Sequence, residues 1–190
     1  TSAGVGVTIA IRSDNTLWSW GSNTAGQLGI NDTLNRSSPA QIGSSSNWSS
    51  ISTKSSHVLA INSLYQLYAW GFNNIGQLGT NDLFYRSSPV QVAGSFSVIS
   101  AGTQTSFAIN AINNTLYGFG RNNLYQLGLT SFTNILSSNN ISVDVVKTND
   151  YTLWTWGSND VGQLGDGTTV NRSFPVQIGT ESNTVVARAM

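Results

Sequence analysis

The sequence predicts an all-β protein assembled from similar repeated units. A segment of thirteen residues is spelled almost identically four times, at residues 17–29, 67–79, 116–128 and 153–165. Its aromatic-glycine step returns after 50, 49 and then 37 residues, and periods of about 20 to 50 residues are typical of solenoids, propellers and arrays. Alternating apolar and polar residues lie beside each copy, as they do in half-buried β-strands.

Each unit is expected to begin with a β-hairpin. Residues 7–11 alternate and include β-branched side chains, and the Asp and Asn of residues 13–15 accept the backbone angles of a tight turn. In the strand at 16–20, Trp18 and Trp20 share one face because side chains alternate along a strand. The same aromatic face recurs in the other copies as Tyr68 and Trp70, Tyr117 and Phe119, and Trp154 and Trp156. We expect it to be buried between sheets rather than to form a stacking platform for a ligand.

A turn with the pattern Gly-x-Asn-x-x-x-Gln-Leu-Gly follows each aromatic strand. Its first glycine is expected to need a backbone conformation closed to residues with a Cβ. Its asparagine is placed to bond the turn backbone, and its leucine is expected to plug the core. The positions that build the repeat are Trp20, Gly21, Asn23 and Leu28; Trp70, Gly71, Asn73 and Leu78; Phe119, Gly120, Asn122 and Leu127; and Trp156, Gly157, Asn159 and Leu164. A phosphate cradle is a poor alternative, because neither a Lys-Ser/Thr pair nor a helical pattern follows.

Three copies continue into a segment that begins Arg-Ser-Ser/Phe-Pro, at residues 36–42, 86–92 and 172–178. Proline lacks a backbone donor and suits the start or the edge of a strand. The arginine stands three residues before the proline each time. We expect it to tether loop backbone to a neighbouring unit; a phosphate contact is the alternative.

Composition narrows the classes of partner. Only 8% of the 190 residues are charged and the net charge is zero, so the basic patch needed for nucleic acid or an anionic membrane is missing. Cysteine is absent, which removes disulfides, thiolate metal sites and a cysteine nucleophile. No cofactor and no membrane span are expected. The Ser- and Asn-rich composition favours an extracellular or virion-surface setting over an intracellular one.

The long motif Trp-Gly-x-Asn-x-x-Gly-Gln-Leu-Gly, followed by a loop, a proline and short strands, resembles the repeat of the regulator of chromosome condensation family. The resemblance implies a β-propeller of four-stranded antiparallel blades, commonly seven in a closed ring. Residues 1–190 are then a single repeat domain. Its repeat cores are expected near 4–43, 54–93, 102–140 and 143–179.

Several departures from the family pattern are present, among them Tyr125 in place of the glycine before Gln126 in the third copy. A histidine before the apolar strand survives only as His57, for which a packed or turn-bonded role is expected rather than a catalytic one. The third repeat is short by 13 residues, so that residues 129–141 must bridge the difference; either a strand is lost, or residues of a longer chain are missing from it.

About four repeats make a small ring, so we expect an arc of a seven-bladed propeller, although residues 185–188 are placed to complete the first blade. Open arcs expose sheet edges, and self-association is therefore expected unless further blades of a longer chain cover them.

No catalytic constellation or metal-ligand spacing is present, so the sequence predicts a non-enzymatic binding or scaffold module. Its partner is expected to be a protein or a glycan, in adhesion or assembly. The aromatic residues peculiar to one copy are the candidate binding residues: Trp48, Phe84, Tyr85 and Phe132. Inter-blade packing is the other reading of these side chains. The family resemblance adds two alternatives, an exchange factor for a small GTPase and a protein inhibitor.

Overall fold

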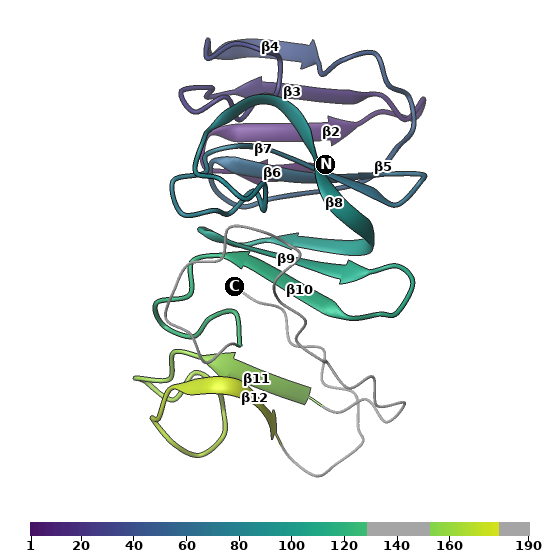
Figure 1. Ribbon diagram of the computed structural model, residues 1–190. Helices are drawn as coiled ribbons and strands as arrows, with labels where there is room; N and C mark the ends of the chain where they lie inside the picture. Colours follow the sequence, from purple (N-terminus) through teal and green to yellow (C-terminus); the bar gives the residue numbers. More distant parts are fainter. Residues whose placement is uncertain (129–152, 179–190) are drawn as a thin grey trace. The chain divides into compact units, whose positions relative to one another are not determined.

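The computed structural model describes residues 1–128 and 153–178, drawn in colour in Figure 1. These residues fall into two compact units, one containing residues 1–121 and the other containing residues 122–128 and 153–178. The described residues are all β, with antiparallel pairing throughout and no helix. The predicted all-β class is confirmed.

The first blade is a four-stranded sheet in chain order. It consists of β1 (Ser2–Gly4), β2 (Val7–Ile11), β3 (Leu17–Gly21) and β4 (Arg36–Gln41). The hairpin between β2 and β3 pairs Thr8 with Trp20 and turns at Asn15, whose φ is 60°. The pairing of β3 with β4 shifts between Ser19 and Gly21, which is the mark of a β-bulge.

The next sheet has six strands and serves two blades. Its strands are β5 (Trp48–Thr53), β6 (His57–Asn62), β7 (Gln66–Gly71), β8 (Arg86–Ala101), β9 (Thr105–Asn110) and β10 (Leu116–Gly120). The first part of β8 pairs with β7, and its last part pairs with β9 (Figure 1). One long strand is therefore the outer edge of the second blade and also a strand of the third.

The second unit contains the hairpin of β11 (Leu153–Gly157) and β12 (Arg172–Ile178). Its register shifts between Thr155 and Gly157, which matches the bulge between Ser19 and Gly21 in the first blade. The repeat motif therefore builds the same local structure in both units.

The core of the first unit lies on both faces of the central strands. One cluster gathers Leu59, Leu67, Leu78, Phe96 and Phe119, and the other surrounds Trp70 with residues of the first blade. The leucines of the four Gln-Leu-Gly turns are buried as expected, with exposed fractions of 0% for Leu28, Leu78 and Leu127 and 8% for Leu164.

The expectation of a single aromatic buried face needs correction. Trp70 and Phe119 are fully buried, but so are Leu67 and Ala69 on the opposite face of β7. In the first blade the order is reversed: Leu17 and Ser19 are buried while Trp18 and Trp20 are partly exposed. A blade with neighbours on both sides buries both faces, and the first blade has a neighbour on one side only within its unit.

Some predictions lie outside the described residues. They concern Phe132, the shortened third repeat with its bridge at 129–141, the start of the fourth repeat core at 143, and the closing strand at 185–188.

Candidate functional site

Each repeat carries a loop that is held by one buried asparagine. In the second blade, Asn73 accepts the backbone N–H of Leu78 through Oδ1 at 2.9 Å. Its Nδ2 donates to the carbonyl oxygens of Asp82 and Phe84, at 2.9 and 3.2 Å. The same acceptor contact to the turn leucine is made by the other three asparagines, Asn23, Asn122 and Asn159. The predicted role in bonding turn backbone is confirmed.

Among the described residues, an ion pair closes the loop of the first, second and fourth repeats. Arg36 bonds Asp32, Arg86 bonds Asp82, and Arg172 bonds Asp166 with 2.6 Å between Nε and Oδ2. Arg86 also donates to the carbonyl oxygen of Phe84. Arg36 and Arg86 bond loop backbone as predicted. The predicted link to a neighbouring unit is wrong, because the ionic partner of each arginine is an aspartate of its own loop. The Asp-x-x-x-Arg spacing of the first two copies was the signal for this pair.

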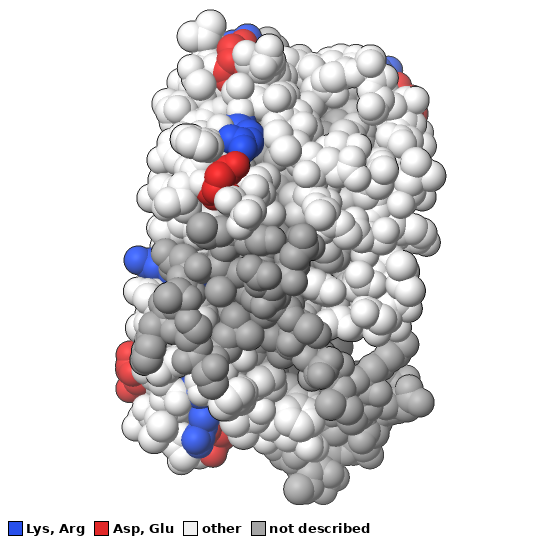
Figure 2. All heavy atoms as spheres, viewed as in Figure 1, with Lys and Arg blue, Asp and Glu red and all other residues white. Residues whose placement is uncertain are grey.

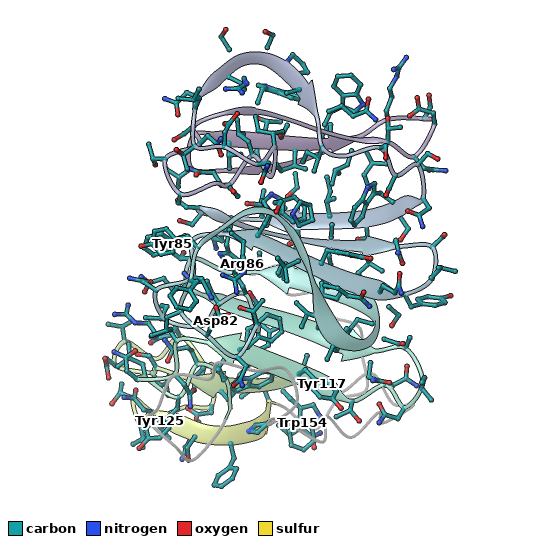
Figure 3. The ribbon with its side chains drawn as sticks, turned by 45° about the horizontal axis from the view of Figure 1, so that its top comes forward. Asp82, Tyr85, Arg86, Tyr117, Tyr125 and Trp154 are labelled. Atoms are coloured by element: carbon teal, nitrogen blue, oxygen red, sulfur yellow. The ribbon has the colours of Figure 1, made fainter. Side chains whose placement is uncertain are left out.

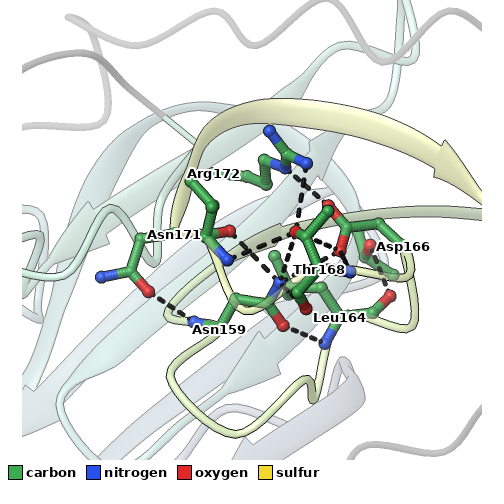
Figure 4. A network of polar contacts seen from close by, with 8 residues as sticks. Asn159, Leu164, Asp166, Thr168, Asn171 and Arg172 are labelled. Atoms are coloured by element: carbon green, nitrogen blue, oxygen red, sulfur yellow. Dashed lines mark hydrogen bonds and ion pairs between the residues drawn. The ribbon is translucent and has the colours of Figure 1, made fainter.

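Figure 4 shows the version of this network in the second unit. Asp166 accepts the Thr168 hydroxyl at 2.8 Å as well as Arg172, and Asn171 accepts the backbone N–H of Asn159. The pKa of Asp166 is lowered to about 2, chiefly by the hydrogen bond from the Thr168 hydroxyl and also by the one from Arg172, since both favour the ionised carboxylate. The loop is therefore a rigid, internally bonded platform at neutral pH.

The second blade presents aromatic side chains on this platform. Phe84 is 71% exposed and Tyr85 is 48% exposed, and Leu83 beside them is 50% exposed. The Tyr85 ring packs on Phe72 with 4.6 Å between centroids, and the Arg86 guanidinium lies 5.9 Å from the centre of the Phe84 ring. Figure 3 shows Tyr85 and Arg86 with Asp82 at one edge of the ribbon. We call residues 82–86 the aromatic loop.

Two substitutions relative to the first blade occur together at the aromatic loop. In the first blade, Asn35 accepts the backbone N–H of Asn23, and Ser22 stands before that asparagine. In the second blade Tyr85 takes the place of Asn35 and Phe72 takes the place of Ser22, and the two rings contact each other. The prediction that Phe84 and Tyr85 lie in a loop is confirmed; sequence reasoning passed over Leu83, which adds to the same surface.

Trp48 does not lie in a loop. It is the first residue of β5, is 6% exposed, and packs edge-on against Tyr68 with 5.1 Å between centroids. Its placement among the loop aromatics is wrong, because the strand that precedes His57 begins earlier than the turn pattern indicates. Its indole N–H is buried and has no hydrogen-bond partner.

Trp48 also lines a cavity of about 490 Å³ in the first unit. None of the residues around this cavity is charged; they include the side chains of Gln41, Asn47, Asn62 and Gln66 and the ring of Tyr68. The cavity therefore combines neutral amides with two aromatic rings.

His57 is a packed residue, as expected. It is fully buried, and its Nε2 lies 3.0 Å from the Ser106 hydroxyl. That hydroxyl donates to the Gln77 carbonyl at 2.7 Å, so its oxygen must accept from His57 Nε2–H. Burial lowers the pKa of His57 to about 4. A neutral, fully enclosed imidazole is unsuited to proton transfer with a bound substrate.

Charged groups are sparse over the described surface. Figure 2 shows a few blue and red patches among described residues that are otherwise white. Within residues 1–128 and 153–178, no group of three or more His, Asp or Glu side chains could hold a metal ion. No helix among the same residues has the length and apolar character to cross a membrane.

Comparisons with solved structures agree with this architecture. Human WBSCR16 superposes with a TM-score of 0.79 at 18% identity, covering 94% of this chain and 52% of that one. Prp20p from Saccharomyces cerevisiae gives 0.75 at 18% identity, with coverages of 93% and 49%. Yeast RCC1 (Prp20) in a crystal structure with Kap60 gives 0.68 at 20% identity, with coverages of 80% and 38%. The chain thus spans about half or less of these proteins, and the likeness establishes the propeller fold.

No curated protein matches the chain in sequence. The model of the regulator of chromosome condensation (RCC1) repeat does match, over residues 14–61, 66–109 and 152–189, which is more than half of the chain. These segments contain three of the four asparagine-held loops, those of Asn23, Asn73 and Asn159, and most of the strands described above. The chain therefore belongs to the RCC1 repeat family.

Proposed function

We propose that this chain is a non-enzymatic protein-interaction module whose contact surface is centred on the aromatic loop, residues 82–86. The observation that carries the proposal is the exposure of Leu83, Phe84 and Tyr85 on a loop that Asn73 and Arg86 hold in place. Exposed aromatic side chains on rigid backbone supply contact area at a low entropic cost, and such residues dominate binding energy at protein interfaces.

Two further observations support a protein partner. The yeast relative Prp20 has been crystallised with the protein Kap60, and the other Prp20p structure is described together with binding to Gsp1p and histones. The chain's own surface is nearly uncharged, which favours an apolar contact over an electrostatic one. From the Ser- and Asn-rich composition of the chain we also propose an extracellular or virion-surface setting, with a role in adhesion or assembly.

The test exchanges the loop for the sequence of the first blade. The double variant Phe84→Leu/Tyr85→Asn installs the residues found at Leu34 and Asn35, in a loop that the equivalent Asp–Arg pair closes in the first blade. A partner identified by cross-linking should bind this variant roughly 30-fold more weakly or worse, since aromatic anchors are commonly worth about 2 kcal/mol or more.

The matched control is Leu34→Ala in the first blade, where the side chain is 66% exposed, close to the 71% of Phe84. It should bind like the unaltered chain. Equal affinity of all three proteins for the partner would show that the aromatic loop is not the contact surface. Accelerated nucleotide release from a small GTPase would favour the exchange-factor alternative, and inhibition of a partner enzyme would favour the inhibitor alternative.

A second candidate function rests on the cavity beside Trp48. Its neutral amides and two aromatic rings match the hydroxyl groups and apolar faces of an uncharged saccharide. The buried indole N–H of Trp48 has no partner, which leaves one donor for a ligand oxygen.

Calorimetric titration with neutral oligosaccharides tests this candidate. Trp48→Phe keeps the ring volume nearly constant and removes the donor, so it should weaken binding at least about tenfold. Failure of every neutral oligosaccharide to bind the unaltered chain would remove the glycan candidate and leave the aromatic-loop proposal untouched.

A further inference from the structure

The carbonyl oxygen of the Gln-Leu-Gly glutamine accepts a hydrogen bond in three successive turns. Trp70 Nε1 donates to Gln27 at 3.0 Å, and Trp156 Nε1 donates to Gln126 at 3.2 Å. The third blade has Phe119 in place of the tryptophan, which cannot donate. There the donor to Gln77 is the hydroxyl of Ser106, at 2.7 Å.

Ser106 is the cross-strand partner of Phe119 in the pairing of β9 with β10. The corresponding pair is Val58 with Trp70 in the second blade. An apolar residue therefore accompanies the donating tryptophan, and a hydroxyl residue accompanies the phenylalanine. In the third blade the donor is therefore on β9 instead of β10, and the backbone carbonyl of the turn glutamine still accepts a hydrogen bond.

The glycine that ends each of these three turns packs closely against the aromatic ring of the next blade. Gly29, Gly79 and Gly128 have φ values of 70°, 70° and 72°. A Cβ added to them would lie 2.7 Å from Trp70, 3.0 Å from Phe119 and 3.0 Å from Trp156, respectively. Only glycine allows this approach, so the turn and the ring form one interlocking contact, which we call the turn–ring lock.

The first blade carries the ring of such a lock without a turn. Trp20 occupies the position of Trp70 but is partly exposed, whereas Trp70 is fully buried. Within residues 1–121, the described part of its own unit, no residue accepts a hydrogen bond from its indole N–H. The ring borders a hollow of about 330 Å³ lined by Ala10, Arg12, Trp18, Trp20 and Pro39.

Among the described residues of the second unit, the fourth repeat has the turn but no ring against it. Gly165 has the same φ of 70° as the three locked glycines, yet a Cβ built on it meets nothing within 4 Å. Leu164 is 8% exposed, while the three corresponding leucines are fully buried. The chain therefore presents both halves of the contact that it makes internally.

We propose that the Gln163–Gly165 turn of one copy docks on Trp20 of a second copy and forms an intermolecular turn–ring lock. The Trp20 indole N–H would donate to the Gln163 carbonyl, and Gly165 would lie against the ring. The contact joins two different surfaces, so each molecule has one donor face and one acceptor face.

A complementation experiment on the 190-residue chain tests this pairing. The unaltered chain should show concentration-dependent association in analytical ultracentrifugation. Trp20→Ala destroys the ring half and Gly165→Ala destroys the turn half, so each variant alone should be monomeric. A mixture of the two should form a one-to-one complex, because one intact ring then meets one intact turn.

Gly167→Ala is the matched control for Gly165→Ala. Gly167 also has positive φ, 76°, and a Cβ there meets nothing within 4 Å, so the backbone strain is alike while the turn stays intact. This variant should associate like the unaltered chain. Far-UV circular dichroism of each variant separates loss of contact from loss of fold.

The indole donor can be tested without removing the ring. Trp20→Phe/Thr8→Val removes both possible donors and should weaken association at least about tenfold, because a buried carbonyl is left without a partner. Trp20→Phe/Thr8→Ser reproduces the Phe119–Ser106 pair, since Thr8 is the cross-strand partner of Trp20. This second variant should retain association close to that of the unaltered chain.

A monomeric unaltered chain at its highest soluble concentration would overturn the proposal. So would association that persists in folded Gly165→Ala, or the absence of a complex in the mixture of Trp20→Ala with Gly165→Ala.

Discussion

At the scale of single residues, a chain of two buried hydrogen bonds explains the residue types at His57 and Ser106. The Nε2–H of His57 donates a hydrogen bond to the Ser106 hydroxyl oxygen, and the Ser106 hydroxyl donates a hydrogen bond to the Gln77 carbonyl. The sequence indicated a packed histidine, but it could not indicate the role of Ser106. That role depends on the cross-strand pairing with Phe119, which replaces a donating tryptophan.

Stability should depend on the protonation of His57. Its pKa falls from 6.5 to about 4 on folding, because burial in the native state favours the neutral imidazole over the charged one. The stabilisation is complete above pH 6.5 and is lost as the pH falls toward 4. We expect the free energy of unfolding to fall by about 2 kcal/mol between pH 7 and pH 4.5, measured by urea denaturation.

The control is His57→Val, which installs the residue that the first blade has at Val7. Its unfolding free energy should stay nearly constant over this range, because the lowered pKa values of Asp14, Asp32 and Asp166 place their titration below pH 3.8. An equal decline in both proteins would show that another group is responsible.

At the scale of elements, the loop after each aromatic strand is fixed by its asparagine and ion pair. The spacing of Asn73 from Leu78 is visible in the sequence, and its backbone-bonding role was predictable from turn chemistry. Two other features were not. The fusion of the second blade's last strand into the sixteen-residue β8, and the burial of Trp48, depend on how neighbouring sheets meet rather than on any local pattern.

Replacing Asn73 by aspartate keeps the shape of the side chain but removes the hydrogen bonds that it donates to the loop. The new carboxylate can still accept from Leu78, but it cannot donate to Asp82 and Phe84, and it would stand 3.2 Å from the Asp82 carboxylate oxygen. We expect a loss of about 2 to 4 kcal/mol in unfolding free energy by urea denaturation, since a buried charge is left beside a like charge.

Asn74→Asp provides the comparison, because it makes the same chemical change one residue away at an exposed position. It should alter stability by less than about 0.5 kcal/mol. Similar losses in the two variants would mean that the asparagine network does not hold the loop.

For the molecule as a whole, repetition made the propeller architecture predictable and left its edges undetermined. The four Trp/Phe-Gly motifs and the RCC1 resemblance indicated how each blade is built, and the glycines at 21, 71, 120 and 157 adopt the expected positive φ. What the motif does not contain is the contact between one blade and the next. The turn–ring lock joins residues 43 positions apart, Gln27 and Trp70, and forms only where two neighbouring blades of the first unit pack together.

The unfolding free energy of Gly29→Ala, compared with that of Gly167→Ala, tests this account most directly. Both glycines have positive φ, 70° and 76°, but a Cβ on Gly29 lies 2.7 Å from Trp70 Nε1 while a Cβ on Gly167 meets nothing within 4 Å. We predict that Gly167→Ala costs about 1 to 2 kcal/mol from backbone strain and that Gly29→Ala costs at least about 2 kcal/mol more. Equal losses in the two variants would contradict the claim that the turn–ring lock holds neighbouring blades together.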